Sequence, residues 1–162
     1  MYVSRIFNSL QESVQEQYRM ELLELNERTK EYGLMLTPQD VDRLLAARTE
    51  VLYSYGRVEL SMEVTKELID VFSTSPFIEQ ETYADTMNEL HEIFYDLKNE
   101  TEDRIGDRQL LHRMKEWFDA DCEGSLDLLK GKLDQYAEKF RRELTKKETL
   151  HEGGDDQCDL TI

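Results

Sequence analysis

Hydrophobic residues recur along this chain at steps of three and four, the spacing that places side chains on one face of an α-helix. The first such stretch covers residues 9 to 32, and Gly33 follows it as a good helix stop. The pattern predicts a long amphipathic helix. Its expected apolar face consists of Leu10, Val14, Tyr18, Leu22, Leu25 and Tyr32.

A second helix has the clearest start signal in the chain, the sequence TPQD at residues 37–40. Thr37 can cap a helix, Pro38 suits the first helical position, and Asp40 is favourable at the positive end of the helix dipole. We expect Gly56 to interrupt this helix. Its apolar face is predicted to be Val41, Leu44, Leu45, Leu52 and Tyr55.

Four further helices are predicted from the same spacing. They cover residues 58–72, 79–103, 107–118 and 125–144. The third predicted helix, residues 58–72, carries apolar residues on two sides and is therefore expected to be central. No strand-like alternation persists, so the sequence predicts an all-α protein, a single compact bundle of about six helices.

The ends of the chain lack helical periodicity and set the expected domain limits. Residues 9–145 are the predicted helical domain, and residues 1–8 a flexible N-terminus. The polar residues 146–162 are predicted to be a disordered acidic tail, because they offer too little apolar surface to offset the entropy of ordering.

Composition narrows the classes of partner. The chain of 162 residues has a net charge of −16 with only 2 Pro and 7 Gly, which favours long helices. This charge argues against binding nucleic acid or an anionic membrane and suits a protein with a basic surface. Cys122 and Cys158 lack metal-ligand spacing and are expected to be reduced thiols. With no apolar signal or membrane-spanning run, we expect a cytoplasmic protein.

The stretch DADCEGSLDLLK, residues 119–130, resembles a calcium-binding loop but departs from it at two ligand positions. Glu123 stands at the fifth position, and Lys130 stands at the twelfth, where a bidentate Glu is required. We therefore interpret the stretch as a turn between helices. Gly124 is expected to end or bend one helix, and Ser125 to cap the next.

Catalytic and metal motifs are also missing. A carboxylate-bridged metal bundle needs Glu three residues before His. Here Asn88 precedes His91 at that distance and Gln109 precedes His112. The thiolate of Cys122, between two acidic neighbours, is disfavoured. The sequence predicts no metal and no cofactor, and it favours a protein without enzymatic activity while leaving this open.

The predicted helix 79–103 holds half of the net charge. It has nine Asp or Glu residues and one Lys, a net charge of −8, and six of the acidic residues lie on the face opposite its apolar residues. A row of carboxylates on a rigid helix can be a solvated face or a docking surface. The first hypothesis is therefore an adaptor or regulator that docks a basic partner protein. Its expected contact residues are Glu89, Glu92, Asp96, Glu100 and Asp103.

Arg48 suggests an alternative, because it lies on an apolar stripe between Leu45 and Leu52. A buried guanidinium needs a partner, for which Glu89 or Glu92 are candidates, whereas an exposed one needs none. The alternative hypothesis is an enzyme or a domain that binds an anion or another small ligand. The pocket would be formed by Arg48, Tyr55, Arg57, Glu59 and His91.

Three stretches carry a resemblance to a known family. They are LLELNERTKEYGLMLTPQDVDRLLAARTEVLYSYGRVEL, YADTMNELHEIFYDLKNETEDRI and GSLDLLKG. The chain resembles, over roughly residues 20–142, an uncharacterised family of small helical bacterial proteins of clostridial type, classed as a domain of unknown function. The resemblance implies a bacterial, cytoplasmic setting, and it implies no activity and no site.

Overall fold

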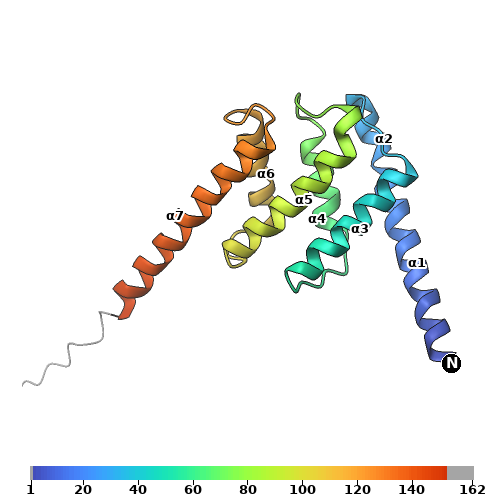
Figure 1. Ribbon diagram of the computed structural model, residues 1–162, viewed down its shortest axis with the longest axis horizontal. Helices are drawn as coiled ribbons and strands as arrows, with labels where there is room; N and C mark the ends of the chain where they lie inside the picture. Colours follow the sequence, from blue (N-terminus) through green and yellow to red (C-terminus); the bar gives the residue numbers. More distant parts are fainter. Residues whose placement is uncertain (1, 153–162) are drawn as a thin grey trace, which may run out of the picture.

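The computed structural model describes residues 2–152, and over this range the chain contains helices and turns but no strand (Figure 1). This confirms the predicted all-α class. The α-helices are α1 (Tyr2–Glu24), α2 (Asn26–Thr29), α3 (Pro38–Ser54), α4 (Glu63–Phe72), α5 (Tyr83–Glu100), α6 (Asp107–Asp119) and α7 (Leu126–Glu152). Two 3-10 turns, η1 (Lys30–Tyr32) and η2 (Gln80–Thr82), precede α3 and α5.

The helices form two layers that the chain visits alternately. Helices α3, α5 and α7 run side by side in one layer, while α4 and α6 return behind them (Figure 1). The central element is α5, which packs against α3, α4, α6 and α7. The expectation that residues 58–72 form the central helix is wrong, because residues 57–62 are a loop in which Val58 and Leu60 are exposed.

The core lies between the two layers and is built largely from the apolar faces of α3, α5 and α6. The rings of Phe72 and Phe118 meet edge to face with centroids 5.6 Å apart, joining α4 to α6. Such contacts add to the burial of apolar area, the main favourable term in folding. The buried residues of α5 are Tyr83, Ala84, Met87, Leu90, His91, Ile93, Phe94, Tyr95 and Leu97.

Local caps set two helix starts as the sequence predicts. Thr37 and Asp40 form a capping box, in which the Asp40 amide donates to Thr37 Oγ1 at 3.1 Å and the Thr37 amide donates to Asp40 Oδ2 at 2.9 Å. At α7 the Leu128 amide donates to Ser125 Oγ at 3.3 Å. Gly124 adopts φ of 81° after α6, which confirms the predicted turn between helices.

The N-terminal helix differs from its prediction at both ends. Helix α1 begins at Tyr2 instead of residue 9, so residues 2–8 of the segment predicted to be flexible are helical. It ends at Glu24, where the Asn26 side chain bonds both backbone groups of Leu36 at 2.8 Å and turns the chain. Leu10 and Val14, predicted to lie on the apolar face of this helix, are exposed because the N-terminal part of α1 projects beyond the other helices (Figure 1).

Helix α7 also runs past its predicted end. It continues to Glu152, so residues 146–152 of the predicted tail are helical, and residues 153–162 lie outside the described part of the chain. Within the extension Thr149 donates its hydroxyl to the Thr145 carbonyl at 3.1 Å, and just before it Arg142 pairs with Glu138 one turn away.

Candidate functional site

A cavity of about 280 Å³ opens between α5, α7 and the end of α3. Its walls carry four carboxylates, Glu92, Asp96 and Glu100 from α5 and Asp134 from α7. The other lining residues are Tyr55, Lys130 and the apolar Ile93, Leu97, Leu133 and Ala137. The site therefore combines an apolar floor with an acidic rim.

Helical spacing explains why these side chains converge. Glu92, Asp96 and Glu100 are separated by four residues each, so they lie on successive turns of one face of α5. Helix α7 packs along the same side of α5, and it presents Lys130 and Asp134 at the same spacing. Asp134 was not among the predicted site residues. Its four-residue step from Lys130 is the only sequence signal that could have found it.

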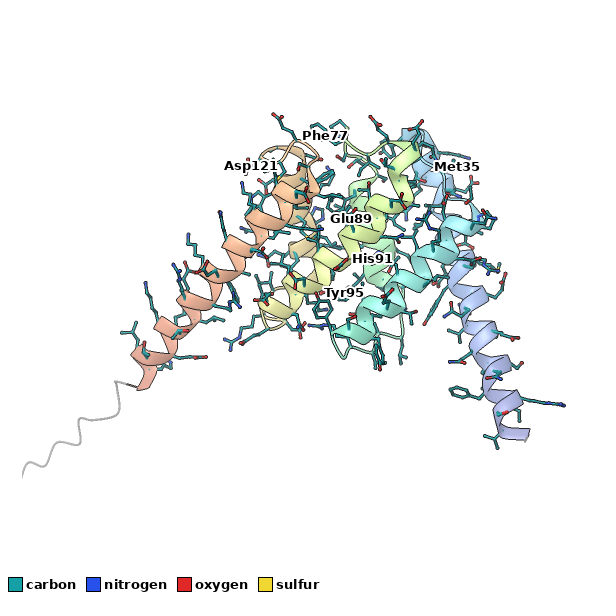
Figure 2. All side chains as sticks on the ribbon, in the orientation of Figure 1. Met35, Phe77, Glu89, His91, Tyr95 and Asp121 are labelled. Atoms are coloured by element: carbon teal, nitrogen blue, oxygen red, sulfur yellow. The ribbon has the colours of Figure 1, made fainter. Side chains whose placement is uncertain are left out.

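A second cavity of about 280 Å³ lies on the other side of α5, against α3. Tyr55 and Glu92 line both cavities, so the two adjoin along α5. Figure 2 shows Glu89, His91 and Tyr95 along α5, between α3 and α7. We call this feature the acidic groove; it consists of the lining residues of both cavities. The second cavity is lined by Ala47, Glu50, Val51, Ser54, Tyr55, Asn88, Glu89 and Glu92.

Only part of the acidic charge is neutralised within the molecule. Glu100 pairs with Arg141, and Glu89 with Lys130 at 3.6 Å. Over residues 2–152, Glu92 and Asp134 have no ion-pair partner. The first cavity therefore keeps an excess of negative charge, beside low-dielectric walls that strengthen its field.

Tyr55 joins α3 to the acidic face. Its hydroxyl donates to Asp96 Oδ1 at 3.1 Å. Burial, followed by the charges of Asp96, Glu92 and Glu100, raises the pKa of Tyr55 to about 12. The phenol thus stays protonated near neutral pH and remains a hydrogen-bond donor.

Asp103 lies apart from the groove, beyond the end of α5. Its carboxylate accepts from Arg57 Nη2 at 2.8 Å and lies 4.0 Å from Lys98 Nζ. Of the five predicted partner-binding residues, the structure thus gathers Glu89, Glu92, Asp96 and Glu100 in the groove and leaves out Asp103.

Arg48 is buried, with 6% of its surface exposed, but its expected carboxylate partner is wrong. Its Nη2 donates to the backbone carbonyls of Glu59 at 2.8 Å and Ser61 at 3.0 Å. The guanidinium also lies 5.5 Å from the centroid of the Tyr18 ring. Arg48 therefore holds the loop of residues 57–62 through two of its backbone carbonyl groups.

His91 is a core residue of α5. It is fully buried, with Nε2 2.8 Å from Thr65 Oγ1 and Nδ1 3.1 Å from the Met87 carbonyl oxygen. Burial lowers the pKa of His91 to about 4, so the ring is neutral near pH 7. Both ring nitrogens have internal partners.

Glu59 and Arg57 complete the residues of the alternative hypothesis. Tyr95 donates to Glu59 Oε2 at 2.5 Å, and Lys98 Nζ lies 3.8 Å from Glu59 Oε1. Arg57 bonds Asp103, as described above. Arg48 therefore contacts Glu59 only at its backbone carbonyl, and Tyr55 lies in the acidic groove. The five residues do not converge around one cavity.

The stretch of residues 119–130 uses two of its four acidic side chains, Asp119 and Asp121, for internal contacts. Asp119 accepts from Ser75 Oγ at 2.5 Å and from Lys115 Nζ at 2.8 Å, while Asp121 pairs with Lys132. Within the described residues, no group of three His, Cys, Asp or Glu side chains is placed to hold a metal ion.

Fold and site together define an all-helical protein with an acidic groove along its central helix. The chain belongs to a family of unknown function, DUF6323, whose model matches residues 21–146. This range includes the acidic groove and leaves out most of α1. No curated protein and no solved structure matches the chain. Between residues 2 and 152, no helix has both the length and the apolar character needed to cross a membrane.

Proposed function

We propose that this protein is a non-catalytic adaptor or regulator that binds a basic segment of a partner protein in the acidic groove. The observation that carries this proposal is the lining of the first cavity, where four carboxylates and one lysine surround an apolar floor. Lysine and arginine side chains match such a site, because their aliphatic stems pack on apolar surface while their charged heads reach carboxylates.

The arrangement of the helices also supports the proposal. Three helices side by side, with return helices behind them, present an extended surface of the kind that stacked helical pairs use to bind partners. The groove follows the middle helix of that surface. We propose neither a nucleic-acid nor a membrane partner, because the net charge of −16 opposes both.

A cytoplasmic setting belongs to the same proposal. Cys122 is a buried free thiol, as is usual for proteins of reducing compartments. A ligand pocket around Arg48, Arg57 and His91 is less well supported, since Arg48 and His91 use their polar atoms for internal contacts. No cofactor is proposed.

The test compares two triple variants with the same change in charge. The groove variant carries Glu92→Gln, Asp96→Asn and Glu100→Gln. The control variant carries Glu63→Gln, Glu81→Gln and Glu116→Gln, three exposed residues outside the groove. Both should remain folded, because Asn and Gln keep hydrogen-bonding capacity and the affected ion pairs are near the surface.

Partners are captured from native cytoplasm by wild type and both variants, and identified by mass spectrometry. Basic segments of captured proteins are then made as fluorescent peptides and titrated. We expect about tenfold weaker binding to the groove variant, and less than threefold to the control, with affinity falling as salt rises. If both variants lose the same amount of affinity, the groove is only a solubilising surface and the proposal is wrong. The same conclusion follows if the binding of partners does not depend on salt or on any of the six substitutions.

A further inference from the structure

The N-terminal half of α1 extends away from the other helices (Figure 1). It carries an apolar stripe that the described chain leaves uncovered. The exposed fractions are 80% for Val3, 61% for Phe7, 61% for Leu10 and 47% for Val14. Four large apolar side chains in line on one helix are too many to be scattered surface residues.

The stripe is the continuation of a buried face. Tyr18 packs against the core and donates its hydroxyl to the Leu60 carbonyl at 2.5 Å, and Leu22 is fully buried. From residue 17 toward the N-terminus, the helix has no neighbour among the described residues. An isolated stretch of this length is marginal in water, since most helical stability in proteins comes from packing an apolar face.

We infer that this stripe is covered by the same helix of a second copy, in an antiparallel pair. Residues 3, 7, 10 and 14 alternate steps of four and three, the spacing of a helix–helix seam. The stripe is also symmetric about a point between residues 8 and 9. An antiparallel partner centred there places Val3 against Val14 and Phe7 against Leu10, so the same patch fits itself around a two-fold axis.

The charges near the stripe permit this approach. Residues 2–20 hold two Arg and two Glu and are neutral, in a chain with a net charge of −16. By helical spacing, Arg5 and Glu12 lie on the face opposite the stripe, and Ser4 and Ser13 lie beside it. This segment is therefore a place where two copies can meet without strong repulsion. Raising the salt concentration should strengthen the pair, because it screens the repulsion between the acidic bodies.

Sedimentation velocity on the full chain tests the association at protein concentrations of about 1–300 µM. High concentrations are included because a seam of two heptads is smaller than a standard interface and its association is expected to be weak. The disrupting variant carries Phe7→Glu and Leu10→Glu. Its matched control carries Asn8→Glu and Ser9→Glu, which add the same charge on the far face. We expect a dimer for wild type and control, and at least tenfold weaker association for the disrupting variant, with circular dichroism confirming that both are folded.

Cysteine crosslinking tests the direction of the pair in a Cys158→Ser background, with Cys122 buried. An equal mixture of Val3→Cys and Val14→Cys proteins should form a disulfide-linked dimer, and Val3→Cys alone should not. Crosslinking of Val3→Cys alone would indicate a parallel pair and overturn the antiparallel seam. A wild type that stays monomeric throughout, or that binds lipid vesicles through α1 as a monomer, would overturn self-association. Salt is expected to strengthen this self-association and to weaken partner binding in the acidic groove. Failure of the self-association is therefore distinguishable from failure of the proposed function.

Discussion

Replacing Arg48 by Met tests the role of the one buried guanidinium identified in the core. Met preserves much of the side-chain length but removes the two hydrogen bonds to the carbonyl groups of Glu59 and Ser61. Hydrogen bonds from a charged donor contribute about 1.5–3 kcal/mol each, and the contact with the Tyr18 ring adds about 0.5–2 kcal/mol.

The expected loss is smaller than the sum of these contributions. Removing the guanidinium also removes the cost of keeping a charge out of water. The loop of residues 57–62 can in addition relax toward solvent and let water bond its carbonyl groups. We therefore expect Arg48→Met to lower the free energy of unfolding by about 3 kcal/mol, a large part of the about 5–15 kcal/mol typical of a domain.

Urea unfolding measures this loss, and Arg43→Met provides the control on the same helix. Arg43 pairs with Asp85, and both side chains are more than half exposed, so its replacement should cost about 0–1 kcal/mol. Hydrogen exchange in the Arg48 variant should also become faster at the Arg57 amide, which donates to the Leu52 carbonyl at 2.8 Å where the loop begins. If Arg48→Met costs less than about 1 kcal/mol, or no more than Arg43→Met, Arg48 does not hold this loop.

Two other predictions concern single residues. The pKa of His91 is lowered to about 4 from the usual 6.5, so below pH 6.5 the unfolded chain binds a proton that the folded protein does not, and stability falls as the pH drops toward 4. Urea unfolding at pH 7 and pH 5 should show that the free energy of unfolding of wild type falls by about 2 kcal/mol from this cause. The control His112→Asn, at an exposed site, should show the same fall, and His91→Asn should not. An unchanged pH dependence in His91→Asn would contradict the prediction. Gly124→Ala should lower the free energy of unfolding by about 2–4 kcal/mol, because φ is 81° and a Cβ would lie 2.5 Å from Phe77 Cβ. Gly56→Ala is the control, because φ is 62° and a Cβ there would meet open space, and it should lower the free energy of unfolding by only about 1–2 kcal/mol. Urea unfolding measures both variants, and an equal loss in the two would show that Phe77 adapts to the added Cβ.

The fold class and several element boundaries could be predicted because they depend on local chemistry. The capping box of Thr37 and Asp40 joins residues three apart, and the apolar face of α5 is a repeat within one helix. Such signals need no information from the rest of the chain. The turn at Gly124 is equally local, since it depends on a positive φ that glycine adopts without strain.

The candidate site could be predicted only in part. The acidic row of α5 is visible in the sequence, and four of its five proposed contact residues lie in the groove. The opposite wall is formed by α7, whose Asp134 lies far along the chain from Glu92. Only the packing of α7 against α5 turns a row of carboxylates into a cavity with an apolar floor.

The sequence by itself determined that the chain is helical, where α3 and α7 begin, and which face of α5 is apolar, because these features follow from spacing and caps within a few residues. It could not tell which apolar faces are covered. Leu10 and Leu22 lie in one predicted stripe of α1, yet Leu22 is buried and Leu10 is exposed. Nor could it show that Arg48 bonds loop carbonyl groups instead of a carboxylate. These outcomes were decided by the tertiary structure, because burial and hydrogen-bond partners depend on where distant helices and loops lie, and periodicity carries no information about that.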